Sequence, residues 1–115
     1  MIWTREPEIL PDNERYEKMT PKEAAEAFFQ ACAEEDWEEV LKFRTVSQID
    51  NHIKNELGGL EIISLGEPFQ SKGYSRLGWF VPYEIRLKSG EVMKYNLAIR
   101  KDNPAKRYVV DGGIY

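Results

Sequence analysis

The residues that could carry chemistry are few in this chain and lie far apart. Its only histidine is His52 and its only cysteine is Cys32, which excludes an intramolecular disulfide and any multi-cysteine metal site. Asp50 and His52 are two positions apart on a predicted helix, so their side chains diverge and cannot form a dyad by themselves. Asp111 precedes two glycines and is typical of a turn at a strand end. These residue types alone define no catalytic pair.

The densest group of acids, residues 34–39, has a structural explanation. Asp36 is a good N-cap, and Glu38 and Glu39 fall in the first turn of the helix it would begin, where the helix dipole favours negative charge. We therefore predict that this group holds no metal, and we expect no cofactor elsewhere in the chain.

Two helix starts organise the first half of the chain. Thr20 and Asp36 each offer a capping oxygen and are followed three residues later by Glu23 and Glu39, the pattern of a capping box. They predict helices over about 21–34 and 37–43 with almost no loop between them. The buried stripe of the first helix has i, i+3, i+4 spacing and consists of Ala24, Ala25, Phe28, Ala31 and Cys32.

A third helix is predicted from Ser47 to Gly58, with Asp50 three residues after its start. Ile49, Ile53 and Leu57 then share one face. The pair Gly58-Gly59 ends this helix, because glycine readily takes the left-handed conformation that closes one.

The second half of the chain predicts an antiparallel sheet. Apolar residues alternate over 79–87 and over 92–101, which is typical of half-buried strands. A three-residue loop, 88–90, with Gly90 in the left-handed conformation pairs Ile85 with Met93 and Tyr83 with Tyr95. An earlier strand over 60–69 loses its alternation between residues 62 and 63, which indicates either a bulge or burial on both faces. A last strand covers 107–111.

Length and composition fit one domain of the α+β class, residues 20–115. Residues 1–19 form an N-terminal arm that docks on it or a linker to something larger. The net charge is −4: residues 1–57 hold 7 Lys/Arg against 14 Asp/Glu, and residues 58–115 hold 9 against 6. A pI near 5.1 argues against a nucleic-acid partner. The chain lacks a secretory signal and an apolar run of about 20 residues, so we expect no membrane insertion and, by default, a cytoplasmic location.

The element order resembles the nuclear transport factor 2-like superfamily, also called cystatin-like α+β. The resemblance rests on residues 20–25 (TPKEAA), 35–41 (EDWEEVL) and 108–113 (YVVDGG), and it extends over residues 20–115. It implies N-terminal helices packed on a strongly curved antiparallel sheet, a cone whose open end is often a ligand pocket. It also implies homodimers through the sheet and a membership that includes isomerases, dehydratases and binding modules.

Two functions remain open. The first is a non-catalytic domain that binds a small apolar ligand or mediates sheet-based assembly. Its pocket residues would be Trp79, Tyr83, Met93 and Tyr95, unless these only fill the core. The alternative is an enzyme similar to ketosteroid isomerases or dehydratases, in which Asp111 or His52 acts with Tyr83 or Tyr95.

The outward face of the sheet suggests the means of assembly. Phe80 and Pro82 lie beside a predicted basic strip, which could meet a second copy or an acidic partner. The strip consists of Arg86, Lys88, Lys94 and Arg100.

Overall fold

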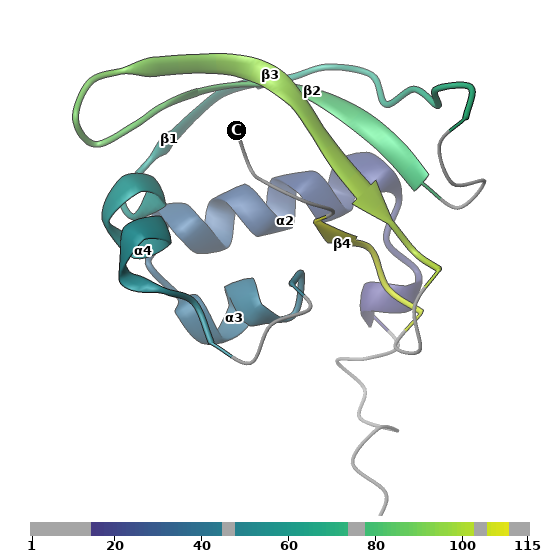
Figure 1. Cartoon of the computed structure of the whole chain (residues 1–115), viewed down its shortest axis with the longest axis horizontal. Helices are drawn as coiled ribbons and strands as arrows, with labels where there is room; N and C mark the ends of the chain where they lie inside the picture. The colour runs from purple at the N-terminus through teal and green to yellow at the C-terminus, as the bar shows by residue number, and fades with distance from the viewer. Residues whose placement is uncertain (1–14, 45–47, 74–77, 103–105, 111–115) are drawn as a thin grey trace, which may run out of the picture.

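Three helices and one antiparallel sheet, preceded by a helical turn at residues 15–17, make up the described part of the chain (Figure 1). The computed structural model describes residues 15–44, 48–73, 78–102 and 106–110. The helices are α2 (Pro21–Ala33), α3 (Trp37–Leu41) and α4 (Asn51–Leu57). The strands are β1 (Glu61–Leu65), β2 (Gly78–Arg86), β3 (Val92–Arg100) and β4 (Val109–Val110). The predicted α+β class is thereby confirmed.

Helix α2 begins with the predicted capping box. The Thr20 hydroxyl accepts a hydrogen bond from the Glu23 backbone N–H at 3.1 Å, and the Glu23 carboxylate accepts one from the Thr20 N–H at 2.9 Å. The predicted stripe is buried, and Phe29 joins it with no exposed surface. The ring of Phe29 lies 4.8 Å from that of Tyr83 between centroids, so this helix face packs directly on β2.

Helix α3 confirms the capping role of Asp36 but not a return bond from Glu39. The Asp36 carboxylate accepts a hydrogen bond from the Glu39 N–H at 3.3 Å. The Glu39 carboxylate binds Tyr16 instead, in the segment that precedes α2. The helix ends at Leu41, two residues earlier than predicted, because Lys42, Phe43 and Arg44 each bond to the carbonyl three residues back.

Helix α4 starts later than predicted. Asp50, and not Ser47, is its N-cap, with its carboxylate accepting the Ile53 N–H at 2.9 Å. Ser47 itself lies outside the described residues. The glycine pair ends the helix as predicted, and Gly59 is the residue with the left-handed φ, +75°.

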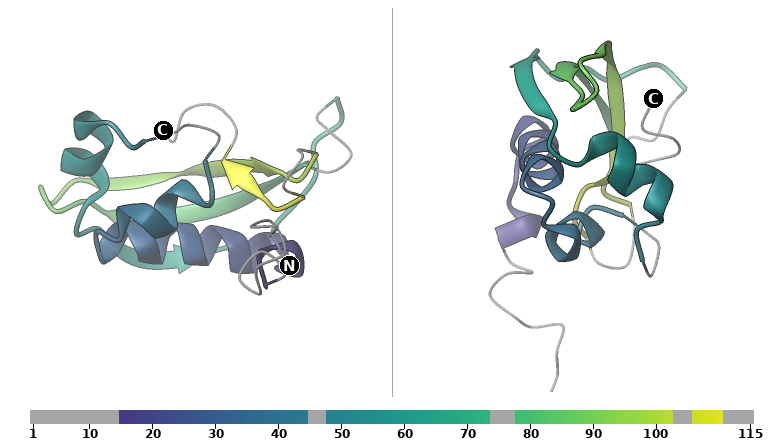
Figure 2. Two further views of the ribbon diagram at one scale, coloured as in Figure 1. Left: turned by 90° about the horizontal axis from the view of Figure 1, so that it is seen from below. Right: turned by 90° about the vertical axis from the view of Figure 1, so that its left-hand side faces the viewer.

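The sheet is a meander in which each strand pairs with its neighbour in sequence, in the order β1-β2-β3-β4. The predicted register of the central hairpin is confirmed, with Tyr83 opposite Tyr95 and Ile85 opposite Met93. The Leu87 N–H donates to the Glu91 carbonyl at 2.7 Å across a three-residue loop, and Gly90 has a φ of +100°. All three helices lie on one side of this sheet (Figures 1 and 2).

The two outer strands are shorter than predicted. The register of β1 on β2 shifts between Ile62 and Ser64, which confirms the bulge, and the strand ends at Leu65. Beyond it, Phe69 forms a single bridge with Phe80. Strand β4 has two described residues, and the Asp111 end of the predicted strand lies outside the described residues. The sheet is not closed, so the cone implied by the resemblance stays a prediction.

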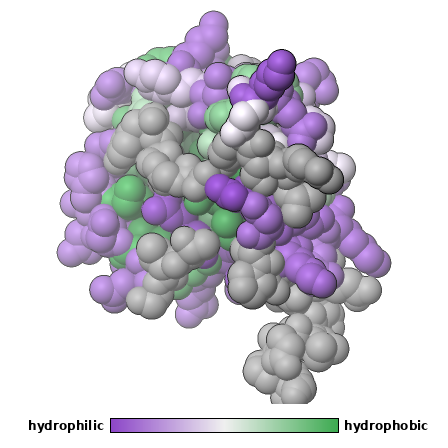
Figure 3. Space-filling model, turned by 45° about the vertical axis from the view of Figure 1, so that its right-hand side comes forward, coloured by the Kyte–Doolittle hydropathy of each residue, from purple (hydrophilic) through white to green (hydrophobic). Residues whose placement is uncertain are grey.

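The core lies between α2 and the helix-facing side of the sheet. It includes Tyr16, which is 1% exposed, so residues just before α2 are part of the packed body. Among the residues that are coloured in Figure 3, most are hydrophilic, and hydrophobic residues show only in small areas between them. Within the described ranges, no helix is both long and apolar enough to cross a membrane.

Candidate functional site

The four predicted pocket residues lie on the helix-facing side of the sheet but differ in burial. Tyr83 and Met93 are 2% and 6% exposed and belong to the core. Trp79 is half-buried, and Tyr95 is 57% exposed. The structure thus brings Tyr83 and Tyr95 together as cross-strand neighbours, yet it packs one against α2 and leaves the other largely uncovered.

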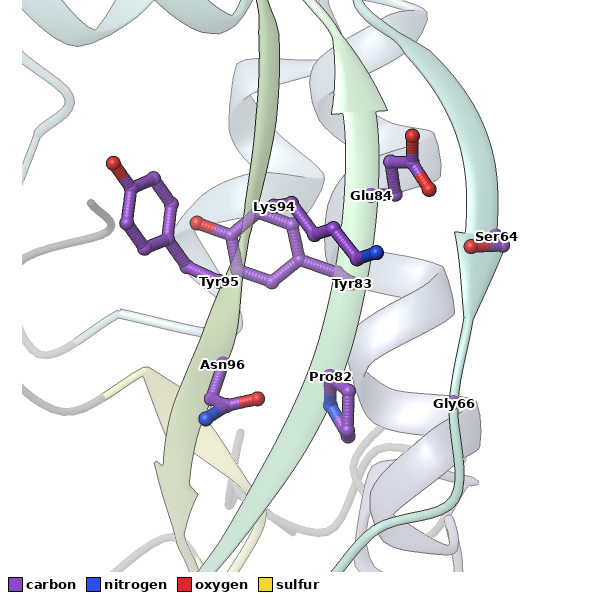
Figure 4. A pocket seen from close by; sticks show the side chains of 8 residues that line it. All are labelled: Ser64, Gly66, Pro82, Tyr83, Glu84, Lys94, Tyr95 and Asn96. Atoms are coloured by element: carbon purple, nitrogen blue, oxygen red, sulfur yellow. The ribbon is translucent and has the colours of Figure 1, made fainter.

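A depression does exist, but it opens on the opposite face of the sheet (Figure 4). Side chains alternate along a strand, so the even-numbered residues of β2 and β3 point away from the helices. The depression has a volume of about 460 Å³ and crosses three strands. It is lined by Ser64, Gly66, Pro82, Glu84, Lys94 and Asn96, with parts of Tyr83 and Tyr95.

Opposite charges stand side by side in this depression. Glu84 and Lys94 are direct partners in the register of β2 and β3. Among the described residues, no ion pair involves Glu84 or Lys94. Both side chains can therefore contact a bound molecule. Ser64 and Asn96 add uncharged donors and acceptors on either side. The arrangement is suited to binding a surface that itself carries both charges.

The predicted basic strip is largely neutralised. Arg86 lies 3.0 Å from the Glu61 carboxylate and Arg100 lies 2.6 Å from that of Asp102. The Lys88 ammonium lies 3.9 Å from the carboxylate of Glu35, two residues past the end of α2. Since Lys94 alone of the four lacks an ion pair among the described residues, this face is not a continuous basic surface.

Apolar side chains flank the depression on the same face. The rings of Phe69 and Phe80 stack with centroids 5.5 Å apart, and Phe69 is 43% exposed. At the hairpin end, Val92 is 46% exposed. Exposed aromatic and aliphatic groups around a polar centre are typical of protein contact surfaces.

The residues of the enzyme hypothesis are not assembled in the described structure. The side chain of His52 is 74% exposed and lies 3.9 Å from the Glu56 carboxylate. Asp111 lies outside the described residues. Cys32 is fully buried, and this burial raises the pKa of its thiol to about 12, so it is no nucleophile at neutral pH. Among the described residues, no three His, Cys, Asp or Glu side chains gather closely enough to hold a metal ion.

One polar cluster, at the start of α3, was not predicted from the sequence. The Tyr16 hydroxyl donates to the Glu39 carboxylate, and Arg15 donates to the same carboxylate at 3.1 Å. The Lys42 ammonium lies 5.1 Å from the centre of the Tyr16 ring. No local signal could have found this cluster, because its members come from two separate segments. The residues that β2 and β3 contribute to the lining of the depression, in contrast, could have been found from the even positions of the predicted hairpin.

No protein-family model, curated protein or solved structure matches this chain, so membership of the nuclear transport factor 2-like superfamily stays a prediction.

Proposed function

We propose that this protein is a non-catalytic binding domain that assembles with a second copy of itself through the outer face of its sheet. The observation that carries the proposal is the sheet face itself. No described element covers it, and it combines exposed Phe69 and Val92 with Glu84 and Lys94 at its centre. Burying such a face against a partner would remove apolar surface from water while pairing its charges.

The positions of the two charges favour a second copy as the partner. A two-fold axis that runs parallel to the strands, midway between β2 and β3, would place Glu84 of each copy opposite Lys94 of the other. An interface with two-fold symmetry uses the same patch on both subunits, so the patch must be complementary to itself. Glu84 and Lys94, as direct cross-strand partners, meet this condition.

Charge reversal tests the proposal. Sedimentation at tens of micromolar should show a dimer for the native chain and a monomer for Glu84→Lys or Lys94→Glu, because each single change sets like charges opposite each other. The double variant Glu84→Lys/Lys94→Glu should restore the dimer. As a control, Lys22→Glu changes a charge on the helical side and should leave the dimer intact. A native monomer at this concentration, or single variants that dimerise normally, would refute the proposal.

The superfamily resemblance adds a second candidate, the binding of a small ligand on the helix-facing side. Its support in the structure is Tyr95, which is 57% exposed on the face where Met93 and Leu97 are buried. Native mass spectrometry of the purified protein tests it: a retained small molecule supports ligand binding, and repeated preparations without one count against it.

A further inference from the structure

Two opposite charges in the depression of the outer face have no ion-pair partner among the described residues. The arginines of β2 and β3 on this face each lie within ion-pair distance of an acid. Glu84 and Lys94 are direct cross-strand partners, yet no ion pair between described residues involves either of them. Opposite charges that face each other across two strands commonly pair. Both groups are therefore available to a molecule that brings a charge for each.

Polar side chains converge on these charges from both neighbouring strands. In Figure 4, Lys94 and Asn96 extend from β3 towards β2, and the Ser64 hydroxyl points towards β2 from β1. The depression has a volume of about 460 Å³, which lies within the range of small-molecule sites, about 300–1,000 Å³. A few convergent polar groups in a hollow of this size are typical of a site that fixes the orientation of a small ligand.

The lining becomes apolar in one direction along the strands. On the outer face of β2, Glu84 is followed by Pro82 and then by Phe80. The Phe80 ring stacks on that of Phe69, which is 43% exposed. Gly66 adds no side chain here, and a Cβ atom at this position would lie 3.1 Å from the Pro82 side chain. A ligand held at the charges can therefore extend an apolar group over Pro82 towards the stacked rings.

From these observations we infer that the depression binds a free α-amino acid with an apolar side chain. The ammonium group of the ligand pairs with Glu84 and its carboxylate with Lys94, because one carbon carries both groups and the two residues are direct neighbours across the strands. The ligand side chain then covers Pro82. A molecule with only one of the two charges leaves the other protein charge without a partner and binds more weakly. The inference uses the face of the proposed dimer but does not depend on it, since a second copy and an amino acid compete for the same charges.

L-Phenylalanine is a suitable probe, because it joins both charges to an apolar ring. In an NMR titration to about 20 mM it should bind with a Kd of about 1–10 mM and shift the backbone resonances around the depression. Phenethylamine lacks the carboxylate and N-acetyl-L-phenylalanine lacks the ammonium group, so each should bind about tenfold more weakly. Both analogues keep the ring, so they separate recognition of the charges from contact with an aromatic group.

Single substitutions test the two contacts. Glu84→Gln and Lys94→Gln each remove one charge, and each should weaken the binding of L-phenylalanine about tenfold. As a matched control, Arg86→Gln removes a charge on the same face outside the depression and should change the affinity by less than about twofold. The inference would be overturned by equal binding of the amino acid and its two analogues, by native affinity in both variants, or by no shift of any resonance.

Sedimentation separates this inference from the proposed dimer. If the native chain is a dimer, L-phenylalanine should shift it towards the monomer, because the amino acid and the second copy both bind at Glu84 and Lys94. Binding that leaves such a dimer intact would overturn the location of the site. If the native chain is a monomer, the dimer proposal fails, and the resonance shifts of the native protein and the two variants still decide for or against the amino-acid site.

Discussion

The buried hydroxyl of Tyr16 donates a hydrogen bond to the carboxylate of Glu39, which ties the segment before α2 to the first turn of α3. The two residues are 23 positions apart, and Arg15 bonds to the same carboxylate. This contact makes residues 15–20, the described residues before α2, part of the folded body. It also takes up the carboxylate that the sequence pattern assigns to a capping box.

Replacing Tyr16 with phenylalanine should destabilise the protein by about 1–2 kcal/mol, because a hydrogen bond to a charged group is lost while the packing of the ring on Phe43 remains. Urea denaturation measures the change. Tyr95→Phe is the matched control: this tyrosine is 57% exposed, and its loss should leave the free energy of unfolding unchanged within error. Equal effects of the two changes would contradict the assigned role of Tyr16.

Stability should fall in alkaline solution. Burial, followed by the hydrogen bond to Glu39, raises the pKa of Tyr16 from 10.0 to about 12, and burial raises the pKa of Cys32 from 9.0 to about 12. Both groups then bind protons more tightly in the folded than in the unfolded chain. Their contribution is fully present below about pH 9 and is lost as the pH rises towards 12.

Chemical denaturation between pH 8 and 12 tests this expectation. Tyr16→Phe removes one of the two groups, so its free energy of unfolding should decline less steeply above pH 10 than that of the native protein. Identical slopes for the two proteins would rule out a contribution from Tyr16.

The contribution of the α2 capping box to the stability of the protein should be measurable. Thr20→Ala removes the oxygen that accepts the Glu23 N–H and should cost about 1 kcal/mol of stability. Thr20→Ser keeps that oxygen and should restore most of the loss. Both changes can be compared by thermal unfolding followed by circular dichroism. If serine were no better than alanine, the cap would not be the source of the effect.

Gly90 should resist replacement for a purely conformational reason. A Cβ atom at this position would meet nothing within 4 Å, but the φ of +100° is strained for any other residue. Gly90→Ala should therefore destabilise the protein by about 1–2 kcal/mol in a urea titration. The neighbouring change Ser89→Ala leaves the glycine in place and should have little effect. A neutral Gly90→Ala would mean that the loop can relax.

The elements that the sequence predicts correctly are those set by near neighbours in the chain. The cap at Thr20, the bulge after Ile62 and the register of Tyr83 with Tyr95 each depend on a few consecutive residues or on one short loop. Glu39 is different, because its partner lies in another segment. A local pattern can show that a carboxylate is available to a cap but not that a distant tyrosine binds it.

The candidate site could be predicted only in part, for a related reason. Met93, Tyr95 and Leu97 follow one alternating pattern, yet only the tyrosine is exposed. Which inward positions become covered depends on where α2 and its neighbours cross the sheet, and periodicity does not encode that.

The neighbour-to-neighbour order of the strands also bears on how the chain folds. The β2–β3 hairpin is closed by a three-residue loop, whereas the bond from Lys101 to the Glu17 carbonyl joins residues 84 positions apart. Short loops cost little entropy to close, so we expect the hairpin to form before the transition state and the contacts of the two ends to form after it. Stopped-flow kinetics should then show that Ile85→Val mainly slows folding and Val110→Ala mainly speeds unfolding. The reverse pattern would mean that the ends of the chain meet first.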